Sequence, residues 1–342
     1  MSSSAGQHFV PWAERHWYRL SIVSILLLPL AVLFGLASAL RRLLYRCGLL
    51  AARRLAVPVI VVGNLTVGGT GKTPLVQWMA ARLQAAGRSP GIVLRGYGSG
   101  SAAPREVAGG DDARSAGDEA VLLAQGCSCP VWTGSDRARA AMALLAAHPH
   151  CDLILCDDGL QHYGLARDIE IAVEDERGHG NGLLLPAGPL REPSSRRVDA
   201  TVVNGAFDAI NNRALPLRSG RVFGMRLQPA GMAWLNGAAV TAQELAGKRL
   251  HAVAGIGNPR RFFRTLQAMG LDFQPHAFPD HHPYVSADLD FAECDAVLMT
   301  QKDAVKCRAF GRDDVIVLRV AAEPEPAFAD FLLEALDGLK TA

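Results

Sequence analysis

Short apolar runs alternate with helical patterns along the middle of the chain, which predicts a parallel β-sheet wrapped by helices. The predicted strands are Pro58–Val62, Gly91–Leu94, Pro130–Trp132, Asp152–Asp157, Ile169–Val173 and Ala200–Asn204. The predicted helices are Leu75–Ala86, Glu119–Gln125 and Arg137–Ala147. Two long connections that are rich in Gly, Pro and charge, Arg95–Gly117 and Gly178–Arg197, are typical of lids or binding loops.

A second, smaller α/β unit is predicted from about Lys248. Its elements are a strand at Leu250–Ala254, a helix near Pro259–Met269, strands at Ala296–Thr300 and Val315–Val320, and a terminal helix at Ala327–Leu339. Before this unit, Arg221–Arg226 and Met232–Leu235 flank Pro229-Ala230-Gly231, which predicts a hairpin linker. The expected organisation is an N-terminal segment (1–50), a larger α/β domain (51–220), the hairpin linker (221–237) and a smaller α/β domain (238–342).

The N-terminal segment differs from the rest in composition. Ser21–Leu40 carries no charge and is about long enough to cross a bilayer as a helix. Aromatic residues precede it, and the arginines that follow it outnumber those before it, which favours a cytoplasmic location for the remaining chain. The helix could span the membrane, lie in the interface on anionic lipid, or be buried in the protein. Pro29 and Gly35 disfavour a straight span, so the sequence predicts membrane association without separating the first two alternatives.

Composition narrows the functional class. The 342 residues include 20% charged residues with a formal net charge of +2, so no global field favours nucleic acid as a partner. Seven cysteines show no paired Cys-x-x-Cys spacing, and Cys127-Ser128-Cys129 lacks a matching second pair, which argues against a zinc site. A reduced, cytosolic-facing environment fits this cysteine usage better than a disulfide scaffold does. No feature of the sequence indicates an obligate protein partner.

The most informative motif lies where a β-branched run meets a Gly-rich loop that ends in Gly-Lys-Thr before a helix. This layout is typical of a phosphate-binding P-loop, whose glycines let backbone amides close around phosphate groups. Lys72 can reach the β- and γ-phosphates, and the hydroxyl of Thr73 can bind Mg²⁺. The usual pattern has Gly at position 66, where this chain has Thr66. The candidate nucleotide-binding residues are Asn64, Gly68, Gly69, Thr70, Gly71, Lys72 and Thr73.

Acidic residues follow a buried strand farther along the chain. Leu153–Cys156 is apolar and leads into Asp157 and Asp158, an arrangement that places a carboxylate beside Mg²⁺ in P-loop proteins. Asp157 is the first choice as metal ligand, with Asp158 either assisting or orienting water. Together with Thr73, these residues form the predicted metal site.

Two further motifs have both structural and functional interpretations. Gly117-Asp118-Glu119 opens a helix, where Asp118 could serve simply as an N-cap. Asp280-His281-His282-Pro283 could be a metal site, but adjacent side chains on an extended segment point in opposite directions, so a surface turn is the simpler interpretation.

Taken together, the motifs resemble those of the tetraacyldisaccharide 4′-kinase family, the lipid A kinases of Gram-negative inner membranes. They run in order over nearly the whole chain: Gly63-Asn64 with Gly68–Pro74, Arg95–Gly98, Gly117–Glu119, Asp157–His162, Leu185–Pro193, Phe278–His281 and Thr300–Ala304. The family shares the departure at Thr66. The resemblance implies an α/β fold with a P-loop NTPase-like parallel sheet, helices on both faces, a second smaller α/β domain and an N-terminal hydrophobic membrane helix.

The resemblance also implies roles for individual residues. Asp118 would be the general base, paired with His281 from the second domain, and Lys72 would stabilise the transferred phosphoryl group. The lipid-disaccharide side would be formed by Arg95, Tyr97, Glu119, Gln161, His162, Arg191 and Glu192. Arg191 suits the phosphate already present on the acceptor, because a planar guanidinium can donate two parallel hydrogen bonds to phosphate oxygens.

The sequence is therefore interpreted as an ATP- and Mg²⁺-dependent kinase that phosphorylates the 4′-hydroxyl of the lipid A disaccharide precursor. It would act at the cytoplasmic side of the bacterial inner membrane. One alternative is a P-loop kinase of a soluble metabolite, which would have no use for the hydrophobic segment. Another is a membrane-bound P-loop ATPase that drives assembly or transport and releases inorganic phosphate.

Overall fold

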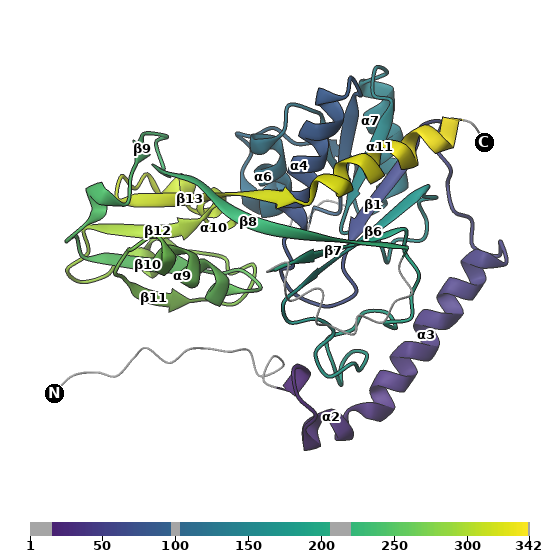
Figure 1. The fold of residues 1–342 in the computed structure, drawn as a ribbon, viewed down its shortest axis with the longest axis horizontal. Helices are drawn as coiled ribbons and strands as arrows, with labels where there is room; N and C mark the ends of the chain where they lie inside the picture. The colour runs from purple at the N-terminus through teal and green to yellow at the C-terminus, as the bar shows by residue number, and fades with distance from the viewer. Residues whose placement is uncertain (1–15, 97–102, 206–219, 341–342) are drawn as a thin grey trace.

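The computed structural model describes residues 16–96, 103–205 and 220–340. Within these ranges, 13 strands form one mixed sheet in the order β11-β10-β12-β13-β8-β7-β6-β1-β5-β2-β4-β3, with β9 paired to β8. Figure 1 shows two lobes joined by β8 and β13. The strands of the larger lobe are β1 (Val59–Gly63), β2 (Pro90–Leu94), β3 (Arg105–Glu106), β4 (Val131–Thr133), β5 (Leu153–Asp157), β6 (Ile169–Asp175) and β7 (Ala200–Asn204). Those of the smaller lobe are β9 (Ala239–Val240), β10 (Leu250–Ala254), β11 (Gln274–Ala277) and β12 (Ala296–Thr300), while β8 (Arg221–Trp234) and β13 (Val315–Pro324) run through both.

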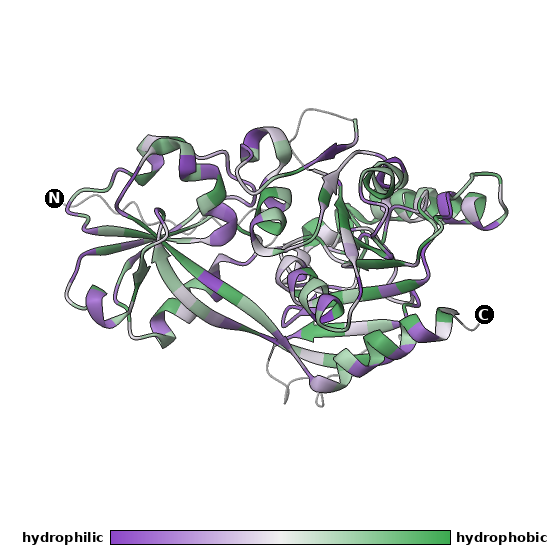
Figure 2. Ribbon diagram, turned by 90° about the horizontal axis from the view of Figure 1, so that it is seen from above, coloured by the Kyte–Doolittle hydropathy of each residue, from purple (hydrophilic) through white to green (hydrophobic). Residues whose placement is uncertain are grey.

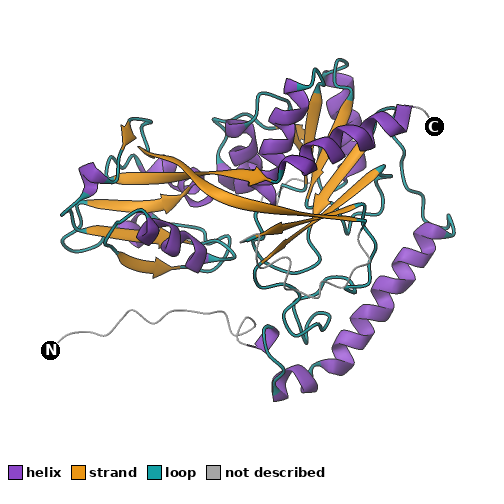
Figure 3. Cartoon of the chain, viewed as in Figure 1, coloured by secondary structure: helices purple, strands orange, loops and turns teal. Residues whose placement is uncertain are grey.

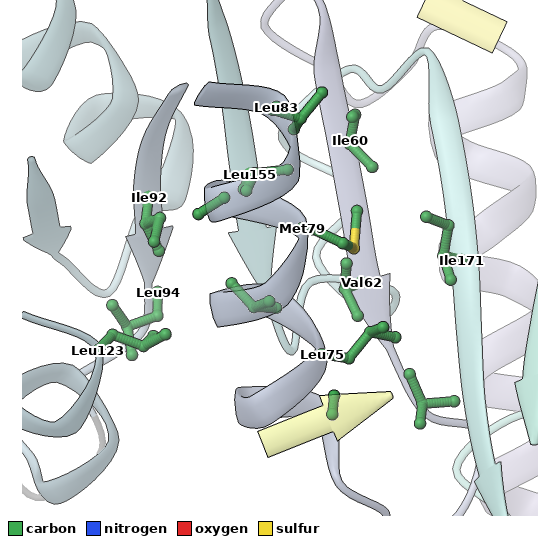
Figure 4. Close-up of a cluster of buried hydrophobic side chains, with 14 of the residues drawn as sticks. Ile60, Val62, Leu75, Met79, Leu83, Ile92, Leu94, Leu123, Leu155 and Ile171 are labelled. Atoms are coloured by element: carbon green, nitrogen blue, oxygen red, sulfur yellow. The ribbon is translucent and has the colours of Figure 1, made fainter. Parts of the chain in front are cut away.

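The larger unit is a sheet with helices on both faces, and its strands are parallel, as the sequence predicts, except β3, which pairs antiparallel with β4 at the edge. Every residue of β1, β2, β5 and β7 is buried, which is typical of parallel strands covered on both sides. Figure 4 shows Leu75, Met79 and Leu83 of helix α4 directed toward Ile60 and Val62 of β1. The helices of this unit are α4 (Lys72–Ala85), α5 (Ala113–Ala116), α6 (Asp118–Gly126) and α7 (Arg137–Ala147), with α7 in the second apolar cluster, on the other face.

The predicted hairpin linker is wrong. Residues 221–234 form one continuous strand, β8, which pairs antiparallel with β13 and contains no turn at Pro229-Ala230-Gly231 (Figure 3). On one side of β8, β7 pairs with residues 221–225 and β9 pairs with residues 232–233. Pro229 lies between these two ranges, where β8 has a partner on its other side only, so no strand is there to need the N–H that proline lacks. Gly231, at φ +108°, lies near a register shift between Leu318 and Val320 rather than in a loop.

The C-terminal helix belongs to the larger core. Helix α11 (Pro326–Lys340) follows β13 back across the molecule, and Phe328, Phe331, Leu332 and Leu336 join the apolar cluster of β1 and α4. The expected domain 238–342 therefore differs from the packing, because β13 returns the chain to the larger unit before the last helix begins. Figure 2 shows green and purple residues alternating along this helix, as on a helix with one buried face.

Three parallel strands of the smaller unit have their carboxyl ends toward the larger unit. Strands β10, β11 and β12 pair in parallel, and their carboxyl ends lead into the segments that contact the larger unit. Two helices accompany them, α9 (Pro259–Ala268) and α10 (Gln301–Cys307). Because ligands of open α/β sheets bind at the carboxyl ends of strands, the facing edges of the two units form the expected location for a site.

The hydrophobic stretch Ser21–Leu40, predicted as one helix, is divided between two helices. Helix α2 (Ile22–Leu26) ends at Leu27, and α3 (Leu28–Arg46) begins with Pro29 in its first turn, where the missing N–H of proline is harmless. Figure 1 shows α3 along one side of the larger unit, separate from the sheet. Among the described residues, α3 is the one helix long and apolar enough to cross a membrane.

Candidate active site

The P-loop connects β1 to α4 and is held by side chains that bind its carbonyl groups. Nδ2 of Asn64 donates to the Gly68 carbonyl at 3.0 Å, and Nδ2 of Asn204 donates to the Thr70 carbonyl at 2.9 Å. Gly71 has φ +97°, and a Cβ there would lie 2.5 Å from Nδ2 of Asn204, so only glycine fits. Thr66 forms a β-bridge with Leu190, which explains why position 66 needs no glycine.

The acidic pair at the end of β5 lies directly beside this loop. Asp157 pairs with Val62 of β1 in the parallel register, and its side chain is buried. Burial and, to a smaller extent, the charge of Glu119 raise the pKa of Asp157 to about 7. Neither carboxylate oxygen has a hydrogen-bond partner among the described residues. Two unpartnered carboxylate oxygens next to a P-loop suit a hard cation such as Mg²⁺.

Asp158 has a different environment from Asp157. Its backbone is left-handed, at φ +48°, and its carboxylate lies 3.1 Å from Nη1 of Arg191 and 3.5 Å from Nζ of Lys72. Burial opposes ionisation, but the charges of Lys72 and Arg191 outweigh it, so the pKa of Asp158 lies well below its ordinary value. Arg137 also donates to the Asp158 carbonyl at 2.8 Å. Asp158 therefore pairs with the side chains of Lys72 and Arg191, whereas Asp157 is the better candidate for a metal ligand.

A magnesium site here would draw on few protein ligands. No group of three His, Cys, Asp or Glu side chains suited to a metal occurs among the residues that the structure describes. Mg²⁺ commonly takes one or two carboxylates plus phosphate oxygens and water, so Asp157 with the hydroxyl of Thr73 fits this ion. The candidate metal site thus depends on a bound phosphate compound for its remaining ligands.

The second candidate centre joins the two units. Asp118 is the first residue of α6, and its Oδ1 accepts a hydrogen bond from the Glu119 amide at 2.8 Å. Its Oδ2 lies 3.0 Å from Nδ1 of His281, which follows β11 in the smaller unit. Gly117 is the N-cap of α6, so the interpretation of Asp118 as an N-cap is wrong, and its carboxylate instead contacts His281. His282 instead contacts Asp288 at 3.0 Å, so the two adjacent histidines do not share a ligand.

Charge governs the protonation of this pair. Burial raises the pKa of the Asp118 carboxyl, but the hydrogen bond from His281 and the charge of Lys302 outweigh it, so the pKa lies below its ordinary value. The hydrogen bond to Asp118 raises the pKa of His281, while burial and the charge of Lys302 oppose the rise. Asp118 is therefore ionised near neutral pH and can accept a proton.

A cleft lies between the P-loop and the smaller unit, and neighbours of the Asp118–His281 pair reach it. Its volume is about 170 Å³, and Lys72, Thr73, Glu119 and Lys302 are among the residues that line it. At one end, Gly257 packs so closely on Gly69 that a Cβ on Gly257 would lie 2.1 Å from the Gly69 nitrogen. The P-loop of one unit and Lys302 of the other, which contacts His281 at 3.2 Å, therefore line the same cleft.

Arg177 connects the two walls of the cleft at that end. Its guanidinium donates to the Gly69 carbonyl at 3.2 Å and to the Gly257 carbonyl at 3.0 Å. Asp175 pairs with Arg177 at 2.9 Å and with Arg261 of α9 at 3.2 Å. Sequence reasoning did not identify Arg177, Asn204 or Arg137, because their contacts join segments that are distant in the chain.

The residues predicted for the lipid side divide into two groups. Arg191 and Gln161 lie at the acidic pair, since Nη1 of Arg191 contacts both Asp158 and Gln161. Glu192 is 2% exposed, and its carboxylate accepts hydrogen bonds from Gln161 at 3.0 Å and from Tyr163 at 2.7 Å. Arg196 lies 2.6 Å from the same carboxylate, which gives Glu192 a supporting position inside the loop rather than an open one.

Of the remaining predicted residues of this group, Glu119 lines the cleft, Arg95 and His162 do not, and Tyr97 lies outside the described ranges. Arg95 is exposed at the end of β2, and Tyr97 falls outside the described residues. Burial lowers the pKa of His162 to about 4, so this imidazole is neutral at physiological pH. Glu119 lies 2.9 Å from Nζ of Lys302, which belongs to a motif that the sequence assigned no role.

Replacement of Asp157 by Asn should stabilise the protein without nucleotide or Mg²⁺, by an amount that grows as the pH rises from 3.8 to about 7 and is constant above that. A carboxyl whose folded pKa is raised from 3.8 to about 7 favours folding at low pH and loses that contribution as it ionises. Thermal unfolding of wild type and Asp157→Asn between pH 5.5 and 8.5 measures the difference.

Asp158→Asn provides the matched control for this measurement. The pKa of Asp158 is lowered, so its contribution is lost only below about pH 4 and should give a constant offset across the same window. A difference between wild type and Asp157→Asn that does not change with pH would contradict the buried, unpaired state of Asp157.

Comparisons with known proteins agree with this geometry. The family model for Tetraacyldisaccharide-1-P 4'-kinase matches residues 23–337. Relatives named tetraacyldisaccharide 4'-kinase include one from Aromatoleum aromaticum, 51% identical over 95% of this chain and 97% of its own length. Another, from Azoarcus sp., is 50% identical over 97% of this chain and 98% of its own length.

A solved structure supports the same assignment. The crystal structure of "apo" form LpxK from Aquifex aeolicus in complex with ATP aligns with a TM-score of 0.77 and 28% identity, covering 92% of this chain and 100% of that chain. Since the family model and the relatives each extend over nearly the whole chain, this protein belongs to the tetraacyldisaccharide-1-phosphate 4′-kinase family.

Proposed function

We propose that this protein transfers the γ-phosphate of ATP to the 4′-hydroxyl of a tetraacylated glucosamine disaccharide 1-phosphate, a step in lipid A biosynthesis. The observation that carries the proposal is the Asp118–His281 contact of 3.0 Å, made across two units, next to Glu119 and Lys302, which line a cleft together with the P-loop. A carboxylate held by an imidazole opposite a phosphate-binding loop suits proton transfer from an alcohol during phosphoryl transfer. Membership of the kinase family supports the same substrate pair.

In the proposed reaction, the acceptor oxygen attacks the γ-phosphorus while Asp118 takes the hydroxyl proton. The bond from the γ-phosphorus to the bridging oxygen of ADP breaks, and ADP leaves with the electron pair. Lys72, which pairs with Asp158, would stabilise the charge that develops on the phosphoryl oxygens, and Arg191, which pairs with the same carboxylate, would bind acceptor phosphate. Mg²⁺, held by Asp157 and Thr73, would neutralise phosphate charge when bound.

The competing function is ATP hydrolysis that drives a partner. A hydrolase needs a positioned water, whereas the Asp118–His281 pair offers a base for a larger acceptor. The test incubates the full chain with γ-labelled ATP, Mg²⁺ and the disaccharide 1-phosphate, followed by thin-layer separation. Label in the lipid supports the kinase. Label released only as inorganic phosphate, at the same rate with or without the disaccharide, would refute the kinase proposal and favour the ATPase.

We further infer that α3 lies in the membrane interface and does not span the bilayer. The helix is about 28 Å long at 1.5 Å per residue, yet α2, which precedes it, and Tyr45, near its C-terminal end, both contact the larger unit. Near the first end, Nδ2 of Asn181 donates to Ser24, and at the other, Tyr45 packs on Tyr163 with ring centres 5.8 Å apart. A spanning helix would place those ends on opposite sides of the bilayer, whereas both contact one folded unit.

The two faces of α3 support this orientation. The face toward the protein carries small or polar residues, among them Ala31, Gly35 and Arg42, and Gly35 leaves space for Leu184. The opposite face carries leucines that are 53–62% exposed: Leu30, Leu33, Leu36, Leu40 and Leu43. Insertion of this leucine face among acyl chains would hold the active site beside its lipid substrate at the cytoplasmic surface of the inner membrane.

A basic groove at the C-terminal end of α3 would meet lipid headgroups. Its volume is about 530 Å³, and its lining includes Arg42, Arg46, Arg167, Arg196 and Arg197. The acidic residue in this lining is Glu170, which pairs with Arg167 at 3.1 Å and with Arg196 at 2.5 Å. The groove therefore carries an excess of positive charge next to the leucine face, as anionic lipid binding requires.

Replacement of Leu33, Leu36 and Leu40 together by Ser should weaken binding to phosphatidylglycerol vesicles at least about tenfold. Each leucine loses about 1.5–3 kcal/mol of burial in lipid, and the contacts of α3 with the larger unit stay intact. Vesicle sedimentation measures the loss, and turnover on vesicle-embedded acceptor should fall more than turnover on detergent-dispersed acceptor.

Val285→Ser controls for loss of an exposed apolar residue, because Val285 is 53% exposed on the smaller unit. It should sediment like wild type. If the triple variant still sediments, or loses both activities equally, the leucine face is not the membrane contact.

A further inference from the structure

Lys302 lies where the two units meet and has no role in the mechanism described above. Its Nζ is 3.2 Å from Nε2 of His281, 2.9 Å from Oε1 of Glu119 and 3.3 Å from Oδ1 of Asp280. The side chain is 17% exposed and begins in the first turn of α10, at the carboxyl end of β12. Lys302 therefore contacts the imidazole on the side opposite Asp118.

The chemistry of an ammonium group determines which imidazole nitrogen holds the proton. A lysine ammonium has three donors and no acceptor, so Nε2 of His281 must accept the hydrogen bond from Lys302. The proton of the neutral ring is then on Nδ1, from which it donates to Oδ2 of Asp118 at 3.0 Å. The opposite tautomer would turn the Nδ1 lone pair toward the carboxylate and remove the hydrogen bond that keeps Asp118 ionised.

The electrostatics of Lys302 are consistent with a permanent donor. Burial lowers the pKa of Lys302, but the charges of Glu119, Asp280 and Asp118 outweigh it and raise the pKa above its ordinary value. An imidazolium would place a second N–H against this ammonium. The charge of Lys302 therefore opposes the rise in the pKa of His281 that the hydrogen bond to Asp118 causes. The charged groups that surround His281 from both units are Asp118, Glu119, Asp280, Lys302, Asp303 and Lys306.

We propose that Lys302 is a positioning residue for the base, which holds His281 as the neutral Nδ1–H tautomer so that Asp118 remains a carboxylate able to accept the acceptor proton. Because Lys302 also pairs with Glu119, the residue next to Asp118, it fixes the imidazole relative to α6 as well as relative to the smaller unit. The kinetic consequence rests on the proposed kinase function, whereas the tautomer can be measured without any reaction.

The first test reads the ring directly. The full chain with ¹⁵N-labelled histidine, in a non-ionic detergent, should show one His281 ring with a protonated Nδ1 and an unprotonated Nε2, assigned by its absence in His281→Ala. In Lys302→Met that signal should change to the Nε2–H tautomer or the imidazolium near neutral pH, and Lys302→Arg should restore it. Lys306→Met is the matched control, because Lys306 lies on the same helix at 4.0 Å from Asp118 and should leave the tautomer unchanged.

The second test measures kinetics on the lipid acceptor. Lys302→Met should lower kcat at least about tenfold, with KM for ATP little changed, because a misplaced proton acts on the chemical step. The acid limb of kcat/KM should move to higher pH, since loss of the ammonium raises the pKa of both Asp118 and His281. Lys302→Arg should recover part of the rate.

A Lys302→Met protein that keeps the wild-type tautomer and pH profile would overturn the proposal, even if it were slower, because the lysine would then act only on structure. A wild-type protein that phosphorylates no lipid would refute the proposed function instead. In that case the ring signal of Lys302→Met would still decide the role of Lys302.

Discussion

Lys72→Ala should lower phosphoryl transfer at least about a hundredfold and leave the fold intact. Its ammonium is the P-loop cation, and removal of one preorganised electrostatic contact to a developing charge typically costs at least this much. The fold should survive, because Arg191 remains at 3.1 Å from Asp158 after the 3.5 Å contact with Lys72 is lost. Label transfer to the lipid at saturating ATP, together with near-UV circular dichroism, measures both properties.

Arg82→Ala is the matched control for this variant. It removes a cation from the last turn of the same helix, far along α4 from the loop, and should retain activity. A well-folded Lys72→Ala protein with activity near wild type would refute the assignment of this loop to the transferred phosphate.

Asp118→Ala and His281→Ala should each lower kcat by about 10²- to 10⁴-fold while changing KM much less, because a base acts mainly in the transition state. The two side chains share one hydrogen bond of 3.0 Å, so they should behave as a unit. The double variant should be little slower than the slower single variant, which steady-state kinetics with the disaccharide acceptor can measure.

His282→Ala controls for the loss of an imidazole from the same segment. His282 contacts Asp288 rather than Asp118, so this variant should keep its kcat. Strictly multiplicative losses in the Asp118 and His281 double variant would show that the two residues act independently and do not form a dyad.

The sequence predicted the elements whose signal is local. The helix at Arg137–Ala147 has the predicted bounds, and β1 and β5 lie within a residue of theirs, because the pattern of apolar residues that marks each element is visible within a few positions. The P-loop was recognisable for the same reason, since its glycines, lysine and threonine are adjacent in the chain.

The features that the sequence missed depend on contacts between distant segments. Pro229 and Gly231 resemble a turn, and only the partners of β8 on each side show why they are tolerated in a strand. The contact of Asp118 with His281 joins positions 163 residues apart, so the residues themselves gave no sign of it and the family resemblance supplied the pairing. Lys302 belongs to a motif that was visible in the sequence, but no role could be assigned to it, because its proposed role depends on the contact with His281 that the fold creates.

The position of α11 has a consequence for how the protein is made. Phe328, Phe331 and Leu332 fill a core that also contains Ile60 of the first strand of the sheet. While the ribosome is still synthesising the last residues, the larger unit lacks these side chains, and its apolar surface remains partly open to water. The leucine face of α3, in contrast, leaves the ribosome early. With the proposed membrane contact of this leucine face, the nascent chain would reach the membrane before its core is closed, and lipid attachment would precede the completion of folding.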